Sequence, residues 1–492
     1  METRHELTEF ERGRAQQKAG DYSAAVTSFL SAVQQDPNNP GPYKSLGDCL
    51  LRLKRCEQAI VAYRKALLLE PDSVALYTNL GAAYQEQGDV VAAATAYENV
   101  LKRAPTDKYA MNNQGLLLLR ENELLEAQRW FERALEVAPA WEQARMNLGI
   151  VQNLLGNFSA AQESYSAVIE SSPEHVDAHI NLGMSQLLEG NFDAGWSNYL
   201  WRTRSEKKIA SSFEAPAWDG REAREKTVLV HAEQGLGDTI QFARYLPAVR
   251  ALSGGVVFRV QPALAPLFAE WKEVDTLWVE GEEPVPFDCH VPLMNLPALL
   301  HTAVDSVPMS AGYLRPIGDT PQDLMRALPQ ERSRLRVGLV WAGNPHHAND
   351  QRRSCPFELL CPLLSLPNIE WFSLQKGNRE GDLRCFPWAG EVRDLSPMVE
   401  GFNRTAHAIE ALDLVISVDT AIAHLAGAMG TPTWVLLPSV PDWRWFLGTE
   451  RSIWYQSVRL FRQTRRGDWA TALLKLEEAL GRLSLDWLGK KG

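Results

Sequence analysis

A single 34-residue period organises residues 1–204. Each unit contains a glycine, and an aromatic residue follows sixteen positions later. The glycines are Gly13, Gly47, Gly81, Gly115, Gly149 and Gly183, and the aromatic residues are Phe29, Tyr63, Tyr97, Phe131, Tyr165 and Tyr199. A proline, which cannot continue a helix, closes each of the first five units. The period predicts two helices per unit, with the aromatic ring filling the space between successive hairpins.

This pattern is typical of tetratricopeptide (TPR) repeats, so we expect an α-solenoid of six TPR units over residues 1–204. The sixth unit lacks the proline and contains Trp196 and Trp201, and we expect it to join the array to the C-terminal half of the chain. One asparagine column, also spaced by 34 residues, consists of Asn79, Asn113, Asn147 and Asn181. These amides could pair with the backbone of an extended peptide on the concave surface, or asparagine could simply be common at this position.

Short apolar runs replace the 34-residue period after residue 204. Runs at 227–231, 255–260, 335–341, 371–374, 414–417 and 433–437 predict buried strands. A helical pattern from Thr420 to Met429 joins the last two, which indicates βαβ units with parallel strands. We therefore predict two Rossmann-like α/β lobes, 205–329 and 330–492. Ligands of such sheets bind at the carboxyl ends of the strands, so the cleft between the lobes is the expected site.

Composition narrows the class of protein. The 492 residues include 50 basic and 61 acidic side chains, for a net charge of −11, and 45% of the residues are hydrophobic. These values argue against wholesale disorder and against a nucleic-acid binder, which needs a basic face. The six cysteines show no CxxC spacing, which favours reduced thiols in the cytoplasm. We find no apolar run long enough for a membrane span and no metal-binding or P-loop motif, so neither a membrane span nor a metal is expected.

A glycine turn follows the first predicted strand at Gly235-Leu236-Gly237-Asp238. Because no third glycine follows in register, it is a weak dinucleotide fingerprint, although Gly235 and Gly237 would let the backbone approach a ligand. Asp238 stands where a strand gives way to a helix. Its carboxylate could act as a general base on a hydroxyl, or it could cap the helix, a position that aspartate favours.

A second polar turn follows the strand at 414–417 and leads into a helix of small residues. Asp419, Thr420 and Ala421 stand at its start, where free N–H groups and the helix dipole suit a diphosphate. His424 lies one turn further and could reach the same ligand, or it could be a hydrogen-bonded histidine of the core.

Two further strand-end loops carry cations. The loop after the strand at 335–341 contains Asn344, Arg352 and Arg353, and an arginine could neutralise a diphosphate. The next loop contains Gln375 and Lys376, which could bind the same ligand or form a solvated turn. The segment 441–445, Pro-Asp-Trp-Arg-Trp, could stack on a base or sugar or pack the rim of the cleft.

At these residues the second half resembles the heptosyltransferase-like family of GT-B glycosyltransferases. That family has a Gly-x-Gly-Asp turn and an Asp-Thr-x-x-x-His-Leu-Ala segment, matched here at 235–238 and by residues 419, 420 and 424–426. The resemblance implies that Asp238 is the catalytic base, that Thr420 and Ala421 bind diphosphate, and that Arg352 or Arg353 is the accompanying basic residue.

The whole chain is similar to bacterial TPR-containing glycosyltransferases, which share their plan with O-GlcNAc transferase, and some of which glycosylate flagellin. The resemblance implies inverting, metal-independent transfer from a nucleotide sugar, as co-substrate, to a protein held by the array. In O-GlcNAc transferase an asparagine ladder holds the acceptor. Two alternatives stay open: transfer to a lipid-linked or surface glycan, and a scaffold whose transferase half is inactive.

Overall fold

The computed structural model describes residues 7–204, 213–308, 311–328, 332–347, 349–386 and 391–489. The predicted lobe boundaries, 204/205 and 329/330, include residues outside the described ranges. The chain divides into two compact units, Met1–Ala178 and His179–Gly492, so the sixth repeat belongs to the second unit. In the part of the chain that is described, none of the helices combines the length and the apolar character needed to cross a membrane.

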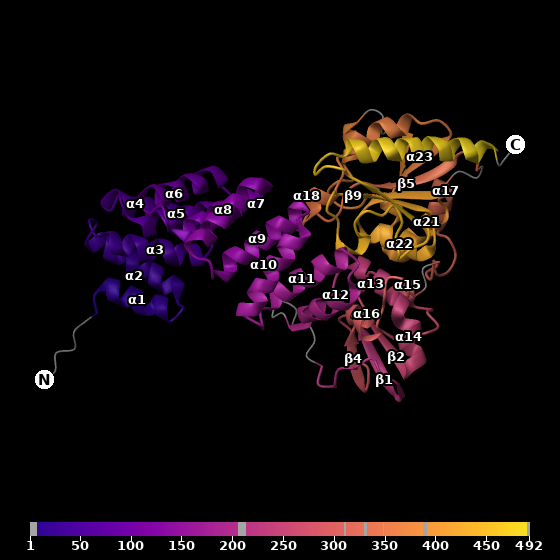
Figure 1. The fold of residues 1–492 in the computed structure, drawn as a ribbon, viewed down its shortest axis with the longest axis horizontal. Coiled ribbons are helices and arrows are strands. Elements are labelled where there is room, and N and C mark those ends of the chain that lie inside the picture. The colour runs from indigo at the N-terminus through magenta and orange to yellow at the C-terminus, as the bar shows by residue number, and fades with distance from the viewer. Residues whose placement is uncertain are drawn as a thin grey trace. The chain divides into compact units, whose positions relative to one another are not determined.

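Helices alone build the N-terminal array, two in each 34-residue unit, as the repeat pattern predicts (Figure 1). Aspartates begin several of them: Asp21, Asp89 and Asp107 each accept a hydrogen bond from the backbone N–H three residues later. The helices are α1 (Glu9–Lys18), α2 (Tyr22–Gln35), α3 (Pro40–Arg52), α4 (Cys56–Leu69), α5 (Val74–Gln87), α6 (Val90–Arg103), α7 (Lys108–Arg120), α8 (Leu124–Val137), α9 (Glu142–Leu155), α10 (Phe158–Ser171), α11 (Val176–Leu188) and α12 (Phe192–Tyr199).

The repeated glycine makes room for the repeated aromatic ring. A Cβ on Gly47 would lie 2.5 Å from the ring of Tyr63, closer than real Cβ contacts come. Gly81, Gly115 and Gly149 meet the rings of their own units in the same way. Each ring therefore packs against the glycine of its own hairpin, whereas the pattern predicted a ring between successive hairpins. This contact holds the two helices of each unit at short range.

Two parallel sheets form the second unit. The first sheet has the strand order β3-β2-β1-β4 and the second has the order β10-β9-β8-β5-β6-β7. All six predicted strands are present, and the sequence pattern missed the short β3, β4 and β7 and the charged edge strand β10. The strands are β1 (Ala223–His231), β2 (Ser253–Val260), β3 (Thr276–Val279), β4 (Cys289–Pro292), β5 (Leu335–Val340), β6 (Ile369–Ser373), β7 (Val392–Asp394), β8 (Leu414–Val418), β9 (Thr433–Leu437) and β10 (Val458–Arg462).

Helices cover both faces of the six-stranded sheet, with α23 on one side and α21 and α22 on the other (Figure 1). On the α23 side, Leu473, Leu476 and Leu480 pack against Val337, Ile416 and other strand residues in one hydrophobic core. The helices of this unit are α13 (Leu236–Phe242), α14 (Leu246–Leu252), α15 (Ala265–Phe268), α16 (Leu296–Leu299), α17 (Gln322–Ala327), α18 (Asp350–Arg353), α19 (Phe357–Leu360), α20 (Asp382–Cys385), α21 (Phe402–Glu410), α22 (Ala421–Met429) and α23 (Ala470–Gly489).

Candidate functional site

The two sheets meet where α13 follows β1 and α22 follows β8. Gly237, in the first turn of α13, lies so close to α22 that a Cβ would stand 2.9 Å from the His424 ring and 3.4 Å from Cα of Ala421. Only glycine fits there without displacing one helix from the other. The carboxyl ends of two parallel sheets therefore open onto the same place, and such sheets bind their ligands at these ends.

Asp238 has a hydrogen-bond donor on each carboxylate oxygen. Its Oδ2 accepts from the backbone N–H of Gly235, three residues earlier, at 2.9 Å. Its Oδ1 accepts from Nη2 of Arg444 at 2.5 Å. Asp238 thus caps α13 from inside the first turn and also forms an ion pair with a residue of the other sheet. A carboxylate offers about four lone-pair positions, so both contacts leave room for a proton.

Sequence reasoning missed Arg444 as a partner of Asp238. It follows β9 and is buried, with Nη1 at 2.7 Å from Oδ1 of Asp442 and its guanidinium stacked 4.3 Å from the Trp443 ring. Burial alone would lower the pKa of Arg444, but the carboxylates of Asp238 and Asp442 outweigh it and raise that pKa. An arginine flanked by aspartate and tryptophan at a strand end was the available signal, and the segment was expected only to stack or pack.

Asp419 lies beside His424, which is buried at the start of α22. Burial and the charge of Asp442 raise the pKa of Asp419 to about 6, against the opposing charges of Arg353 and Arg444. Burial and nearby arginines lower the pKa of His424 far below its usual range, so the ring is neutral. The 3.8 Å approach of His424 Nε2 to Asp419 is therefore not an ion pair. His424 Nδ1 is 3.0 Å from the Tyr455 hydroxyl, which makes this a hydrogen-bonded core histidine at the edge of the site.

Thr420 stands at the N-cap of α22 in an extended backbone conformation. Its hydroxyl lies 3.0 Å from the Ser417 hydroxyl and makes no capping bond to the helix. The N–H groups of the first turn, which begins at Ala421, are thus not capped by this side chain. Such a helix start suits an anion.

The loop after β5 brings Arg353 to this place. Arg353 Nε lies 3.4 Å from Oδ1 of Asp350, and the arginine's charge acts on Asp419 and His424. The charge of Arg352 instead acts on Arg466, and no such effect of Arg352 on Asp419 or His424 is resolved. Of the two arginines left open by the sequence, the structure brings Arg353 to the candidate site.

Other predicted loop residues hold the loops themselves. Asn344 accepts from the backbone of His346 at 3.0 Å within a turn. The buried Gln375 accepts from the N–H groups of Trp341 and Ala342 at 2.9 Å and donates to two carbonyls. These hydrogen bonds use both the amide oxygen and the amide nitrogen, so Gln375 stabilises the loop after β5. Lys376 donates to the carbonyl of Ser396 at 2.9 Å.

Among the described residues, no group of three or more His, Cys, Asp and Glu side chains could hold a metal ion.

Three of the four predicted peptide-binding asparagines lie in the first unit. Asn79 and Asn113 line a groove of about 720 Å³. Asn79 Nδ2 donates to Asp48 Oδ1 at 2.8 Å, and Tyr63 donates to the same oxygen at 2.7 Å. Burial raises the pKa of Asp48 despite these donors. The column thus borders a groove, with Asn79 already bonded to the preceding repeat.

The later members of the column are more enclosed. Asn147 is only 5% exposed, and its Nδ2 donates to Asn112 Oδ1 at 2.8 Å. A peptide could reach that amide only if this bond broke, so Asn147 serves the packing of the array. Asn181 is partly buried and lies in α11, within the second unit.

Family models for TPR repeats match residues 47–88, and those for tetratricopeptide repeats match residues 78–149 and 155–195. A curated relative, Protein FlbA of Caulobacter vibrioides, is 31% identical over 313 residues. That match covers 58% of this chain and 52% of the relative, so the chain spans about half the relative's length.

Three of the solved structures that resemble the chain are each 21% identical to it. They include a tetratricopeptide repeat protein from Parabacteroides merdae (TM-score 0.37, 40% of this chain and 79% of that one). They also include MamA of Desulfovibrio magneticus (0.32, 35% and 97%) and YrrB, described as a TPR protein with an unusual peptide-binding site (0.32, 37% and 95%). With the family models, the helices and the two sheets together, the chain carries an N-terminal solenoid of tetratricopeptide repeats, followed by a region of parallel sheets.

Proposed function

We propose that this chain is an inverting, metal-independent glycosyltransferase of the GT-B type, which moves a sugar from a nucleotide sugar to a hydroxyl of a protein. One observation carries the proposal: Asp238 lies beside the uncapped start of α22, where the ends of two parallel sheets meet. A carboxylate and an anion-binding helix start are the two groups that such a transfer needs.

On the acceptor side, Asp238 is the general base. It takes the proton of the acceptor hydroxyl while that oxygen attacks the anomeric carbon of the sugar from the face opposite the leaving group. Gly235 N–H and Arg444 hold the carboxylate and keep an unoccupied lone pair available. General-base catalysis of this kind contributes roughly 10²–10⁴-fold to the rate.

On the donor side, the bond between the anomeric carbon and the phosphate oxygen breaks, and negative charge grows on the phosphate. The first-turn N–H groups from Ala421 onward, the Thr420 hydroxyl and the Arg353 guanidinium would stabilise that charge. These groups replace the divalent cation that other glycosyltransferases use, which agrees with the absence of an Asp-x-Asp motif from the sequence.

The acceptor is proposed to be a protein, because the repeat array offers a polar groove lined by Asn79, Asn113 and Asp48. Binding there would raise the local concentration of acceptor hydroxyls. The match to FlbA covers more of the chain than residues 1–204, so it extends beyond the repeats. Flagellin, which the resemblance to bacterial TPR-containing transferases implies for some relatives, is the first acceptor to test.

The test is a thermal-shift screen of the purified chain against nucleotide sugars, with and without EDTA, followed by transfer to flagellin read by intact-protein mass spectrometry. We expect one nucleotide to raise Tm whether or not EDTA is present, and flagellin to gain the mass of the sugar. Asp238→Asn should abolish the gain, and Asp219→Asn, which changes an exposed carboxylate paired with Arg221, should not.

Each contrary outcome has its own meaning. Full activity of Asp238→Asn would reject the general-base role. A shift that EDTA removes would reject the metal-independent mechanism. A flat response to every nucleotide sugar would favour a TPR scaffold with an inactive transferase half. Transfer to lipid-linked glycan but not to protein would reject the protein acceptor.

A further inference from the structure

The aromatic residue of the sixth repeat has left the position that its counterparts occupy. In the earlier units a Cβ on the repeated glycine would strike the aromatic ring, as Gly149 would strike Tyr165 at 2.6 Å. In the sixth unit a Cβ on Gly183 would instead meet the backbone, with Tyr199 N at 2.6 Å and Gly195 O at 2.9 Å. The backbones of α11 and α12 are closer together there. The space beside the repeated glycine, which we call the glycine slot, therefore has no room for the Tyr199 ring.

The displaced Tyr199 ring turns toward the turn that carries Asp238. Gln234, which directly precedes that turn, donates from Nε2 to the Tyr199 hydroxyl at 3.3 Å. The next residue back, Glu233, pairs through Oε1 with Nη2 of Arg202 at 2.5 Å, and Arg202 is 2% exposed. Arg202 follows α12 in a short 3₁₀ helix (Leu200–Arg204) and stacks 4.8 Å from the Tyr199 ring.

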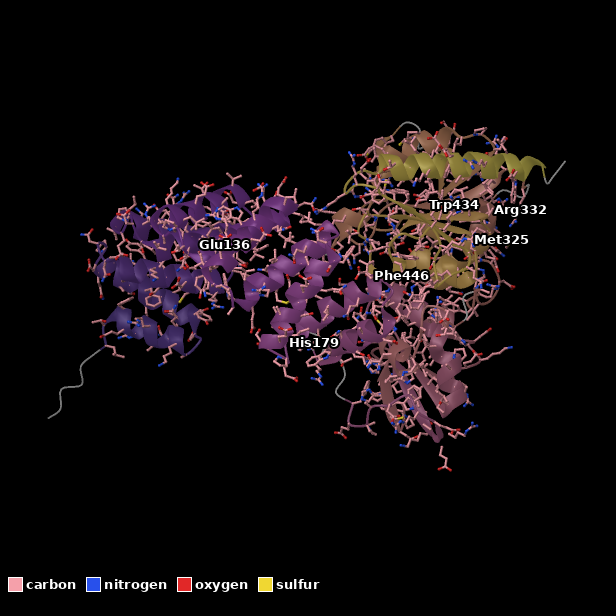
Figure 2. The ribbon with its side chains drawn as sticks, in the orientation of Figure 1. Glu136, His179, Met325, Arg332, Trp434 and Phe446 are labelled. Carbon is pink, nitrogen blue, oxygen red and sulfur yellow. The ribbon has the colours of Figure 1, made fainter. Side chains whose placement is uncertain are left out.

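The same repeat also supports the other partner of Asp238. The Trp443 ring, on which the Arg444 guanidinium stacks, lies 5.7 Å from the Tyr199 ring and 5.4 Å from that of Trp196. Phe192, at the start of α12, packs 5.8 Å from Phe446, which is labelled in Figure 2. Residues 443–446 therefore rest on one face of α12.

We infer that the sixth repeat is a positioning platform for Asp238, with Tyr199 as its central positioning residue. Tyr199 bonds to Gln234, which precedes the turn that carries Asp238. Its ring also contacts Trp443, on which the Arg444 guanidinium stacks. Both hydrogen-bond donors of Asp238 thus depend on one side chain of the repeat array. This role extends the proposed function, because it matters only if Asp238 is the base.

The electrostatic surroundings agree with a neutral hydroxyl at this position. Burial raises the pKa of Tyr199, and the charge of Asp238 acts in the same direction, against the opposing effect of Arg444 and Arg202. A phenol that stays protonated accepts from Gln234 without adding a second negative charge beside Asp238.

The test compares Tyr199→Phe with Tyr165→Phe in the full chain, using the transfer assay, nucleotide-sugar titrations and thermal unfolding. Tyr165 is the matched control because it holds the same column position one unit earlier and its hydroxyl bonds to Asn153, inside the array. We expect Tyr199→Phe to lower kcat about tenfold, which corresponds to the loss of one hydrogen bond that positions Gln234. We expect KM for the donor and Tm to change little, and Tyr165→Phe to leave kcat within about twofold of the wild type.

A second readout does not depend on turnover. Hydrogen exchange of residues 233–238 should accelerate in Tyr199→Phe and in Arg202→Lys, whereas the exchange of residues 47–149 should not change. The inference is overturned if kcat and exchange in Tyr199→Phe match those of Tyr165→Phe, or if kcat falls only as far as the folded fraction falls. Absence of transfer by the wild-type chain would instead reject the proposed function, and this role with it.

Discussion

Arg444 holds Asp238 across the junction of the two sheets, with 2.5 Å between Nη2 and Oδ1. Both side chains are largely removed from water, at 8% and 20% exposure, so removing either one would leave the other charge buried and unpaired. Because Arg444 also binds Asp442, one guanidinium fixes two carboxylates, and the geometry of the candidate base depends on a residue 206 positions away in the sequence.

Removing the guanidinium should cost stability as well as activity. Arg444→Gln leaves Asp238 and Asp442 without their shared cation, and we expect a loss of about 3 kcal/mol in the free energy of unfolding, measured by urea denaturation. In a double-mutant cycle, Asp238→Asn should be less destabilising in the Arg444→Gln background than alone. Additive effects would show that the pair does not couple the sheets. Arg482→Gln, an exposed arginine of α23, is the control and should stay within about 0.5 kcal/mol.

A single methyl group at the contact of α13 with α22 should push the two helices apart. Gly237→Ala places a Cβ 2.9 Å from the ring of His424, and we expect a loss of about 1–3 kcal/mol together with weaker nucleotide-sugar binding. Gly381→Ala is the control, because nothing lies within 4 Å of the added atom. Isothermal titration and urea denaturation measure the two effects, and unchanged values for Gly237→Ala would mean that the helices separate freely.

Two glycine-to-alanine substitutions, one in the array and one in α23, should change the free energy of unfolding in opposite directions. In Gly115→Ala the new Cβ would stand 2.6 Å from the Phe131 ring, and we expect about 1–3 kcal/mol of destabilisation in spite of better helix propensity. Gly481→Ala, inside α23 with open space around it, should stabilise the chain by about 1 kcal/mol. Thermal unfolding of both variants checks this, and stabilisation of Gly115→Ala would contradict the packing of ring against glycine.

Asp419 should make stability depend on pH in a particular direction. Its folded pKa of about 6 lies above the usual 3.8, so the folded state binds the proton more tightly than the unfolded state does. The contribution of Asp419 to stability is therefore greatest below about pH 4 and is lost as pH rises through 6. The wild-type minus Asp419→Asn difference in unfolding free energy should fall over this window, and a flat or rising difference would contradict the raised pKa.

The same titration bears on ligand binding. A protonated Asp419 removes a negative charge beside the start of α22, so a nucleotide diphosphate should bind more tightly at pH 5.5 than at pH 7.5. In Asp419→Asn this pH dependence should shrink, because an amide stays neutral at both values. Isothermal titration at the two pH values measures the effect.

The parts of the molecule that sequence predicted are those whose causes are local. A glycine and an aromatic residue sixteen positions apart lie in one hairpin, so their repeated spacing predicted the paired helices. The contact of Gly47 with Tyr63 inside the hairpin was not predicted, because the ring was expected between successive hairpins. The same holds for strands such as β8, whose five residues are all buried and all apolar or small. The short strand β7 has only one buried residue, Val392, so its pairing with β6 left no pattern.

The site was only half predictable for the same reason. Asp238 and Thr420 stand at strand ends, a position that the order of elements reveals. Arg444 and Tyr199 reach Asp238 and Gln234 through tertiary contacts. The residues around Arg444 mark it as a candidate site residue, but they do not indicate that its partner is Asp238. The structure also distinguishes Arg353 from Arg352: both stand at the end of α18, but only Arg353 acts on the charges of Asp419 and His424.

The glycine slot limits how this chain can change length. Because each ring fills a slot in its own hairpin, removal of residues 81–114 would join Leu80 to Gly115 and leave every remaining slot with its ring. Recombination between repeats could thus lengthen or shorten the array, and with it the partners that the array can hold. The sixth repeat cannot be exchanged in this way, because its Tyr199 ring lies outside the glycine slot and contacts residues beyond the repeats.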